Sequence, residues 1–307
     1  MTATVALERV YLPMRLGELT LGGANLRMSV DKTHFLQNHA PRIPPPDQVD
    51  GDGHLVRSCP VDTPLPRLAL TDGYLRYVPK QYLRHYIDLT MGWEAYQQQF
   101  SGKTRQTLRR KVRKFAKVSG GELEWRCYRS AEEIDTFHRL AREVSRQTYQ
   151  ERLLDAGLPN SEAFLDLSRQ RAEQDRLRAY LLFLDDEPVA YLYCPARDGV
   201  LFYSFLGYRP DVAHLSPGTV LQWLVLESLF AEGRFQVFDF CAGDSSHKAH
   251  FGSAHKYCAD LYFIRRRPRP LALGLSHAAL DGVSGLAAGV LERLGVKQRI
   301  KRLIRRQ

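Results

Sequence analysis

The chain has 307 residues, of which 44% are hydrophobic and 25% charged, a composition that argues against disorder and allows one large or two modest globular domains. No apolar run reaches the length of about 18 residues that a membrane-spanning helix needs. The N-terminus lacks the basic start and apolar core of a secretory signal. We therefore expect a cytoplasmic protein.

The cysteines and histidines do not form a metal-binding pattern. The chain has 5 cysteines, all far apart, and none forms a Cys-x-x-Cys pair, which argues against a disulfide framework and a zinc ribbon. One dense group remains, with irregular spacing over a helix, a loop and a strand and no second ligand pair: His247, His250, His255 and Cys258. We expect no metal.

The net charge of +10 is concentrated in two segments, residues 103–117 and residues 290–307. The remainder of the chain is mildly acidic, so its body is not expected to bind polyanions.

The first 92 residues are predicted to form an α+β lobe. Strand-like runs at residues 74–78 and 82–89 are separated by turn-rich sequence. Residues 39–53 combine three consecutive prolines with Asp-Gly repeats, so they are predicted to form a mobile loop.

Residues 93–120 are predicted to form a basic connecting helix that ends at Gly120-Gly121. One face is apolar at helical spacing, from Phe100 through Leu108 to Phe115, and the other faces are basic. The basic faces are either simply solvated or contact an anionic acceptor such as a nucleotide-linked sugar, an acidic glycan or a lipid headgroup. Binding of nucleic acid is disfavoured, because aromatic side chains are not interleaved with the basic ones.

Residues 121–266 are predicted to form one domain around a mixed β-sheet flanked by helices. The sequence Ser130-Ala-Glu-Glu133 is a capping box that begins a helix. The expected order is a strand at 122–129, helices at 130–150 and 161–174, strands at 177–184, 189–196 and 200–206, a helix at 216–233, a strand at 235–241, a short helix at 246–251 and a strand at 258–265. In a sheet with this order, ligands bind where parallel neighbours diverge.

Residues 267–307 are predicted to form a helical tail with a basic end. Apolar residues from Val283 to Leu294 recur at helical spacing, and Lys and Arg residues follow. This pattern suits peripheral attachment to the anionic inner face of a membrane. Packing of the tail against the rest of the enzyme is the alternative.

Residues 207–222 read as a strand, a loop and a helix that begins at Ser216-Pro217-Gly218-Thr219. The free amides and the dipole at a helix start favour an anion. Gly218 would admit a phosphate close to the backbone, and the Ser216 or Thr219 hydroxyl could donate to it. An ordinary helix start, with Ser216 as its cap, is the alternative.

Asp239 lies between Phe238 and Phe240 in an apolar strand, where a carboxylate needs a partner or a task. Lys248 follows on the next short helix. The two could hold a polar substrate, or Asp239 could take a proton from an attacking amine. A buried Asp239–Lys248 pair that fixes the loop is the alternative.

These stretches, in this order, resemble the GNAT superfamily, and more closely its Fem-type and cellulose-biosynthesis-associated (CelD-like) branch. The likeness spans roughly residues 93–266 and includes the basic helix. It rests on Ser216-Pro217-Gly218, Glu232-Gly233, Asp239, Gly243 and Lys248. Fem-type relatives carry two such domains, so residues 1–92 are a candidate for a reduced first one.

The resemblance implies transfer of an acyl group from acetyl-CoA or a longer acyl-CoA, or of an aminoacyl group from tRNA, to an amine or hydroxyl. Ser216, Gly218 and Thr219 would bind the cofactor pyrophosphate. Asp239 would be the base or a substrate anchor, Tyr203 the proton donor to the departing thiolate unless it is only a core residue, and Lys248 the anchor of an anionic substrate.

Three functions follow from these expectations. The first is a GNAT-type N- or O-acyltransferase that acts on a sugar, an amino acid or a cell-envelope precursor, as in polysaccharide biosynthesis. The second is a non-catalytic binding module for an anionic glycan or a biosynthetic complex, which the loop with a single glycine favours. The third is a Fem-type transferase that uses aminoacyl-tRNA.

Overall fold

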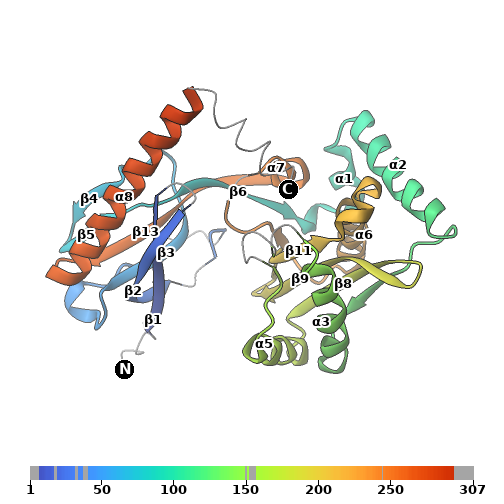
Figure 1. Cartoon of the computed structure of the whole chain (residues 1–307), viewed down its shortest axis with the longest axis horizontal. Coiled ribbons are helices and arrows are strands. Elements are labelled where there is room, and N and C mark those ends of the chain that lie inside the picture. The colour runs from blue at the N-terminus through green and yellow to red at the C-terminus, as the bar shows by residue number, and fades with distance from the viewer. Residues whose placement is uncertain are drawn as a thin grey trace. The chain divides into compact units, whose positions relative to one another are not determined.

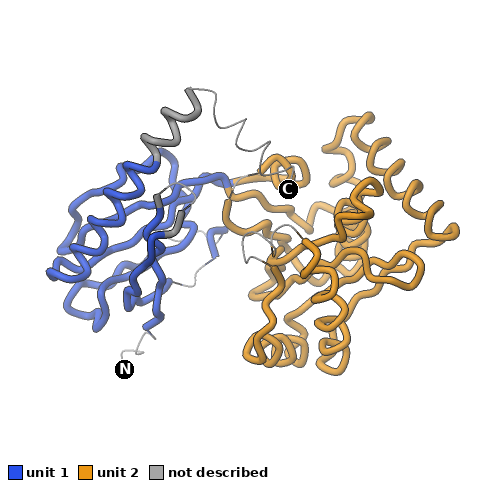
Figure 2. Tube along the Cα trace, in the orientation of Figure 1, with its two compact units in different colours: residues 1–83, 256–307 blue, residues 84–255 orange. Residues whose placement is uncertain are grey.

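The computed structural model describes residues 7–16, 19–31, 34–36, 41–148, 151, 157–243 and 245–293. The backbone divides into two compact units (Figure 2). Unit 1 consists of residues 1–83 and 256–307, and unit 2 of residues 84–255. In the part of the chain that the structure describes, no helix has the length and apolar character to cross a membrane.

Unit 1 is built on a β-sheet in the order β1-β2-β3-β13-β5-β4 (Figure 1). The pair β2–β3 is parallel and the other pairs are antiparallel. Helix α8 packs on this sheet and contributes Ala278 to a core with Leu26, Met28 and Leu55. The elements are β1 (Leu7–Leu16), β2 (Leu19–Asp31), β3 (Gly53–Pro60), β4 (Leu68–Thr71), β5 (Tyr74–Tyr77), β13 (Ala254–Arg265), α8 (Pro268–Arg293) and the 3-10 helix η1 (Pro46–Gln48).

The two units divide the chain differently from the segments expected from the sequence. Strand β13, expected at the end of the 121–266 domain, pairs with β3 and β5 in unit 1. The described part of residues 1–92 contains strands and short 3-10 helices, and the α-helix of unit 1 is α8. Both differences come from pairings between residues about 200 positions apart, such as Leu261 with Val56 and Tyr262 with Tyr77, which local sequence patterns do not encode. The basic residues of 294–307 lie outside the described residues.

Unit 2 contains a mixed sheet in the order β6-β12-β10-β9-β8-β7, with β11 also paired to β9 (Figure 1). Its strands are β6 (Gln81–Asp88), which enters from unit 1, β7 (Trp125–Tyr128), β8 (Leu177–Leu184), β9 (Glu187–Arg197), β10 (Val200–Phe202), β11 (Phe205–Tyr208) and β12 (Val237–Asp239). Its helices are α1 (Trp93–Gln98), α2 (Gly102–Val118), α3 (Ala131–Ser145), α5 (Glu162–Glu173), α6 (Pro217–Glu232) and α7 (Ser246–Phe251), with the 3-10 helices η2 (Leu89–Met91) and η3 (Pro210–Leu215).

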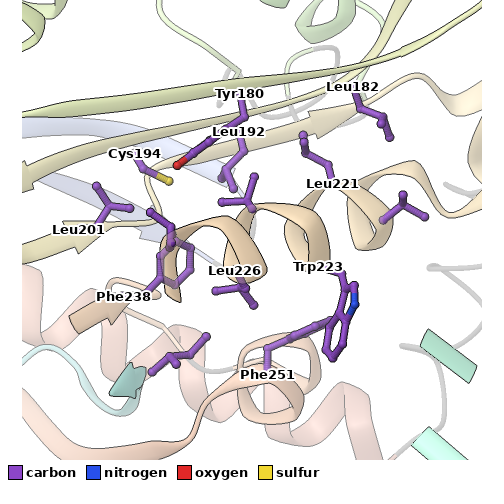
Figure 3. Close-up of a cluster of buried hydrophobic side chains, with 14 of the residues drawn as sticks. Tyr180, Leu182, Leu192, Cys194, Leu201, Leu221, Trp223, Leu226, Phe238 and Phe251 are labelled. Atoms are coloured by element: carbon purple, nitrogen blue, oxygen red, sulfur yellow. The ribbon is translucent and has the colours of Figure 1, made fainter. Parts of the chain in front are cut away.

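Helices cover both faces of this sheet. Helices α3 and α5 pack on one face, and α1, α2, α6 and α7 share a core with the other. Helix α6 is the central element, because Leu221, Trp223 and Leu226 are all buried against strands and neighbouring helices (Figure 3). The predicted mixed sheet flanked by helices is therefore confirmed.

The strand expected at residues 200–206 is interrupted. β10 and β11 both pair with β9, but only β10 pairs with the parallel strand β12. At the interruption, the Tyr203 amide donates to the Asp239 carbonyl at 2.9 Å, and beyond it the Phe240 amide donates to the His85 carbonyl at 3.1 Å. The parallel strands therefore diverge after Tyr203 and Asp239, with β11 following β9 and Phe240 following β6.

The capping box at the start of α3 is present, as predicted. The Glu133 carboxylate accepts from the Ser130 amide and hydroxyl, each at 3.0 Å. The amides of Arg129 and Ser130 lower the pKa of Glu133. Glu133 therefore stabilises the helix fully above its unfolded-state pKa of about 4.3, and this stabilisation is lost as the pH falls through the lower folded-state pKa.

Replacing Ser130 by Ala is expected to lower the free energy of unfolding by about 1 kcal/mol at pH 7, because an N-cap hydroxyl is lost. Urea unfolding of the two proteins measures this difference. Ser119→Ala is the control, since the Ser119 side chain makes no hydrogen bond among the described residues and should change stability by less than about 0.5 kcal/mol. Equal losses in both variants would contradict the role of the capping box.

Candidate active site

All six candidate site residues lie in unit 2, near the divergence of β10 and β12. Tyr203 directly follows β10, and Asp239 is the last residue of β12. Ser216, Gly218 and Thr219 lie at the start of α6, and Lys248 lies on α7. The structure therefore brings the ends of two diverging strands together with the starts of the two helices that follow them.

The helix start predicted at Ser216-Pro217 is confirmed, but the predicted side-chain cap is wrong. Ser216 has a left-handed backbone (φ 57°, ψ 46°), which directs its side chain away from the amides of the first turn. Its carbonyl accepts from the Thr219 and Val220 amides, each at 3.0 Å. The hydroxyls of Ser216 and Thr219 make no hydrogen bond to any described residue, so both can donate to a ligand.

Gly218 lies in a tightly packed position. A Cβ atom at this position would lie 3.1 Å from Tyr208 Cδ1 and 3.2 Å from Leu206 Cδ2. Glycine therefore lets the first turn of α6 approach β11 closely. This contact accounts for the residue type whether or not a phosphate approaches the same backbone.

A pocket with a volume of about 520 Å³ adjoins the start of α6. We call it the basic pocket, because Lys103, Lys111, His247 and His250 line it together with the Thr219 hydroxyl. None of the described residues that line it is acidic. Two lysines on the basic face of α2 therefore line the same cavity as residues of α6 and α7.

Asp239 is fully buried and paired with Arg84 of β6. Its carboxylate accepts from Arg84 Nε at 3.1 Å and from Arg84 Nη2, and it also accepts from the Cys241 amide at 2.8 Å. Cys241 has a left-handed backbone with φ 61°, an unusual state for a non-glycine residue. The Asp239 carboxylate thus shapes the loop that leads to α7.

Lys248 contacts this loop, and Tyr203 packs against Phe240, which comes just before it. The Lys248 Nζ donates to the Ala242 carbonyl at 2.8 Å, so it also holds the loop. The Tyr203 ring lies 5.4 Å from the Phe240 ring and 6.4 Å from the His247 ring. Burial raises the pKa of the Tyr203 hydroxyl, which is therefore protonated at neutral pH.

Two residues near the site were missed in the sequence. Arg84 lies 155 positions before Asp239, and the only sequence signal for it was that a buried carboxylate needs a cation. Gln222 is a fully buried polar residue between the apolar residues Leu221 and Trp223 of α6, a signal that was present in the sequence. Its Oε1 atom contacts His247 Nε2 at 2.7 Å.

Among the described residues, no group of three or more His, Cys, Asp or Glu side chains could hold a metal ion.

Comparison with known proteins gives a family for this part of the chain. Residues 102–249 match the family model described as an acetyltransferase (GNAT) domain. FemX is a solved structure with 9% identity, a TM-score of 0.52 and coverage of 88% of this chain and 91% of that one. L-PGS from Bacillus licheniformis has 14% identity, a TM-score of 0.45 and coverage of 74% and 73%. A search of curated proteins finds no match.

The match of residues 102–249 supports a transferase in the broad sense. Residues 102–249 form a GNAT domain, so the predicted family is confirmed for this part of the chain, and the similarity to FemX shows a similar fold.

Proposed function

We propose that unit 2 transfers an acyl group from an acyl-CoA to an amine or hydroxyl of a sugar, an amino acid or a cell-envelope precursor. The observation that carries this proposal is the basic pocket, because it joins four nitrogen-bearing side chains to the start of α6. CoA carries a pyrophosphate and a further phosphate, and such groups are bound by helix N-termini and by Lys.

The residues divide into two groups by their expected roles. Thr219, Ser216 and the start of α6 would bind the pyrophosphate, with Lys111 and Lys103 supplying positive charge from α2. The acyl thioester would reach the divergence of β10 and β12, where Tyr203 would donate a proton to the departing thiolate. Asp239 acts as a positioning residue, because its carboxylate already accepts from Arg84 and Cys241. Lys248 would anchor an anionic substrate next to the same loop.

Calorimetric titration of the full chain with acetyl-CoA and with lauroyl-CoA tests the donor. Lys111→Glu is expected to weaken binding by about tenfold or more, because a charge-assisted contact is replaced by repulsion. Lys117→Glu is the matched control: it makes the same charge change on the same helix but outside the basic pocket. Absence of binding for both thioesters, or equal losses in the two variants, would contradict an acyl-CoA donor.

A second candidate is transfer from aminoacyl-tRNA, which a groove of about 600 Å³ on the other side of α2 favours. Arg105, Arg109 and Arg113 line it above Trp223 of α6. A row of arginines suits the phosphate backbone of a nucleic-acid strand, although Trp223 is buried and Glu227 also lines the groove. This candidate predicts that the chain binds tRNA in a salt-dependent way and that Arg109→Glu weakens this binding. It also predicts that the chain does not bind acyl-CoA. Binding of acyl-CoA without turnover would instead favour a non-catalytic module.

Attachment to an anionic membrane surface remains a proposal that rests on the basic residues at 293–306. Co-sedimentation with anionic vesicles, lost on truncation after Arg293, would support it, because this truncation keeps α8 in the core of unit 1.

A further inference from the structure

His247 has a fixed orientation at the wall of the basic pocket. Its Nε2 atom faces the Oε1 atom of Gln222 at 2.7 Å, and Gln222 is fully buried on α6. An amide oxygen only accepts, so the Nε2 atom of His247 carries the hydrogen and the Nδ1 atom has the free lone pair. No described residue donates to Nδ1.

Aromatic rings hold the imidazole in place. The ring centroid of His247 lies 5.0 Å from that of Phe251 and 6.5 Å from that of Phe240. These contacts and the Gln222 hydrogen bond leave the ring little freedom to rotate. Rigid placement of a side chain in a cavity is what a catalytic group requires.

The surroundings of His247 keep it neutral. Burial, followed by the positive charges of His250, Lys111 and Lys248, lowers the pKa of His247. Tyr203 is the other titratable group facing the ring, and burial raises the pKa of its hydroxyl. At neutral pH the site therefore holds a neutral imidazole, His247, and a protonated phenol, Tyr203, whose ring centroids lie 6.4 Å apart. Two neighbouring groups whose pKa values are moved apart are suited to act as base and acid.

We propose that His247 is the general base of the transfer reaction, an inference that rests on the proposed function. The acceptor nitrogen or oxygen attacks the thioester carbonyl and its proton passes to His247 Nδ1, while the new C–N or C–O bond forms. The C–S bond then breaks, and Tyr203 gives its proton to the departing sulfur. The proton on His247 returns through solvent to the Tyr203 phenolate, which restores both groups.

His250, the neighbouring histidine in the basic pocket, is not equivalent. It is exposed and lies against Phe100, with ring centroids 5.6 Å apart, and no described residue fixes either of its ring nitrogens. The inference therefore assigns the proton transfer to His247 alone.

The test measures hydrolysis of acetyl-CoA, with water as acceptor, by the full chain and follows the released CoA thiol. His247→Ala is expected to lower kcat about 100-fold or more while KM and calorimetric affinity for acetyl-CoA stay within about threefold, since a base acts on the step and not on donor binding. The rise of kcat with pH, set by the lowered pKa of His247, should disappear in this variant. Gln222→Glu should move that rise to higher pH by about one unit, because a carboxylate favours the imidazolium.

His138→Ala is the matched control. His138 is also a partly buried histidine of unit 2, and its Nε2 atom contacts the Pro159 carbonyl at 2.9 Å, on α3 and away from the basic pocket. The kcat of the His138→Ala variant should equal that of the wild-type protein.

Nitrogen-15 NMR of the histidine rings decides the tautomer without any turnover. A hydrogen on Nε2 and a bare Nδ1 at pH 7 support the inference, and an imidazolium or an Nδ1-protonated ring overturns it. Failure of the wild-type protein to bind acetyl-CoA would contradict the proposed function. Wild-type turnover by a His247→Ala protein that binds acetyl-CoA would contradict the assignment of the base.

Discussion

Replacing Asp239 by Asn is expected to lower the free energy of unfolding of unit 2 by about 3–5 kcal/mol, because removing one partner of a buried ion pair leaves the other charge uncompensated. Asp239 is 0% exposed and the Arg84 side chain 12% exposed. Asn has nearly the same volume as Asp and keeps one acceptor oxygen. The loss of unfolding free energy therefore measures the effect of the charge and not of a change in volume. Denaturant unfolding followed by tryptophan fluorescence reports on unit 2 alone, since Trp93, Trp125 and Trp223 all belong to it.

An exposed ion pair of the same unit is the control for this prediction. Arg126 and Glu124 are 61% and 37% exposed, so Glu124→Gln should cost less than about 1 kcal/mol. The double variant Arg84→Met with Asp239→Leu should be more stable than Asp239→Asn, because no buried charge remains. A loss for Asp239→Asn no larger than for Glu124→Gln would show that the pair does not hold β12 to β6.

Asp239 also contacts the loop that carries part of the site. Asp239 fixes the Cys241 amide, and the loop from Cys241 leads directly to α7, which carries His247 and Lys248. The residue that donates this hydrogen bond, Cys241, has a left-handed backbone with φ 61°. Asn can still accept from the Cys241 amide through its one oxygen, so Asp239→Asn tests the charge of the ion pair more than the position of this loop.

The regular elements of unit 2 could be predicted because their signals are local. The capping box at Ser130, the hairpin turn at Asp185-Asp186 and the glycine that ends α6 at Gly233 all act within a few residues. Each provides a turn or cap that the neighbouring residues need, so each is readable in sequence.

The remaining features depend on contacts between distant residues. The predicted strand divides into β10 and β11 at the point where its pairing with β12 ends. The Arg84–Asp239 pair joins two strands through residues 155 positions apart. Spacing alone suggested that His247 was part of a weak metal pattern. The contact with Gln222 indicates a different role, and Gln222 could have been suspected as a polar residue within the apolar run Val220 to Leu226.

Replacing Tyr203 by Phe is expected to lower kcat for release of CoA from acetyl-CoA by about 100-fold, the usual contribution of a positioned general acid. The ring and its contacts with Phe238 and Phe240 remain, so the fold and the affinity for acetyl-CoA should not change. Tyr208→Phe is the control: Tyr208 is 42% exposed at the end of β11, and its hydroxyl makes no hydrogen bond to a described residue.

The pH dependence separates an acid from a core residue at Tyr203. A general acid works only while it is protonated, and burial holds the pKa of this hydroxyl above its usual value of about 10. Wild-type kcat should therefore show no fall up to about pH 9, because Tyr203 still carries its proton there. If Tyr203→Phe releases CoA as fast as Tyr208→Phe, then Tyr203 only fills the space between β10 and α7, and the proton that reaches the sulfur must come from solvent.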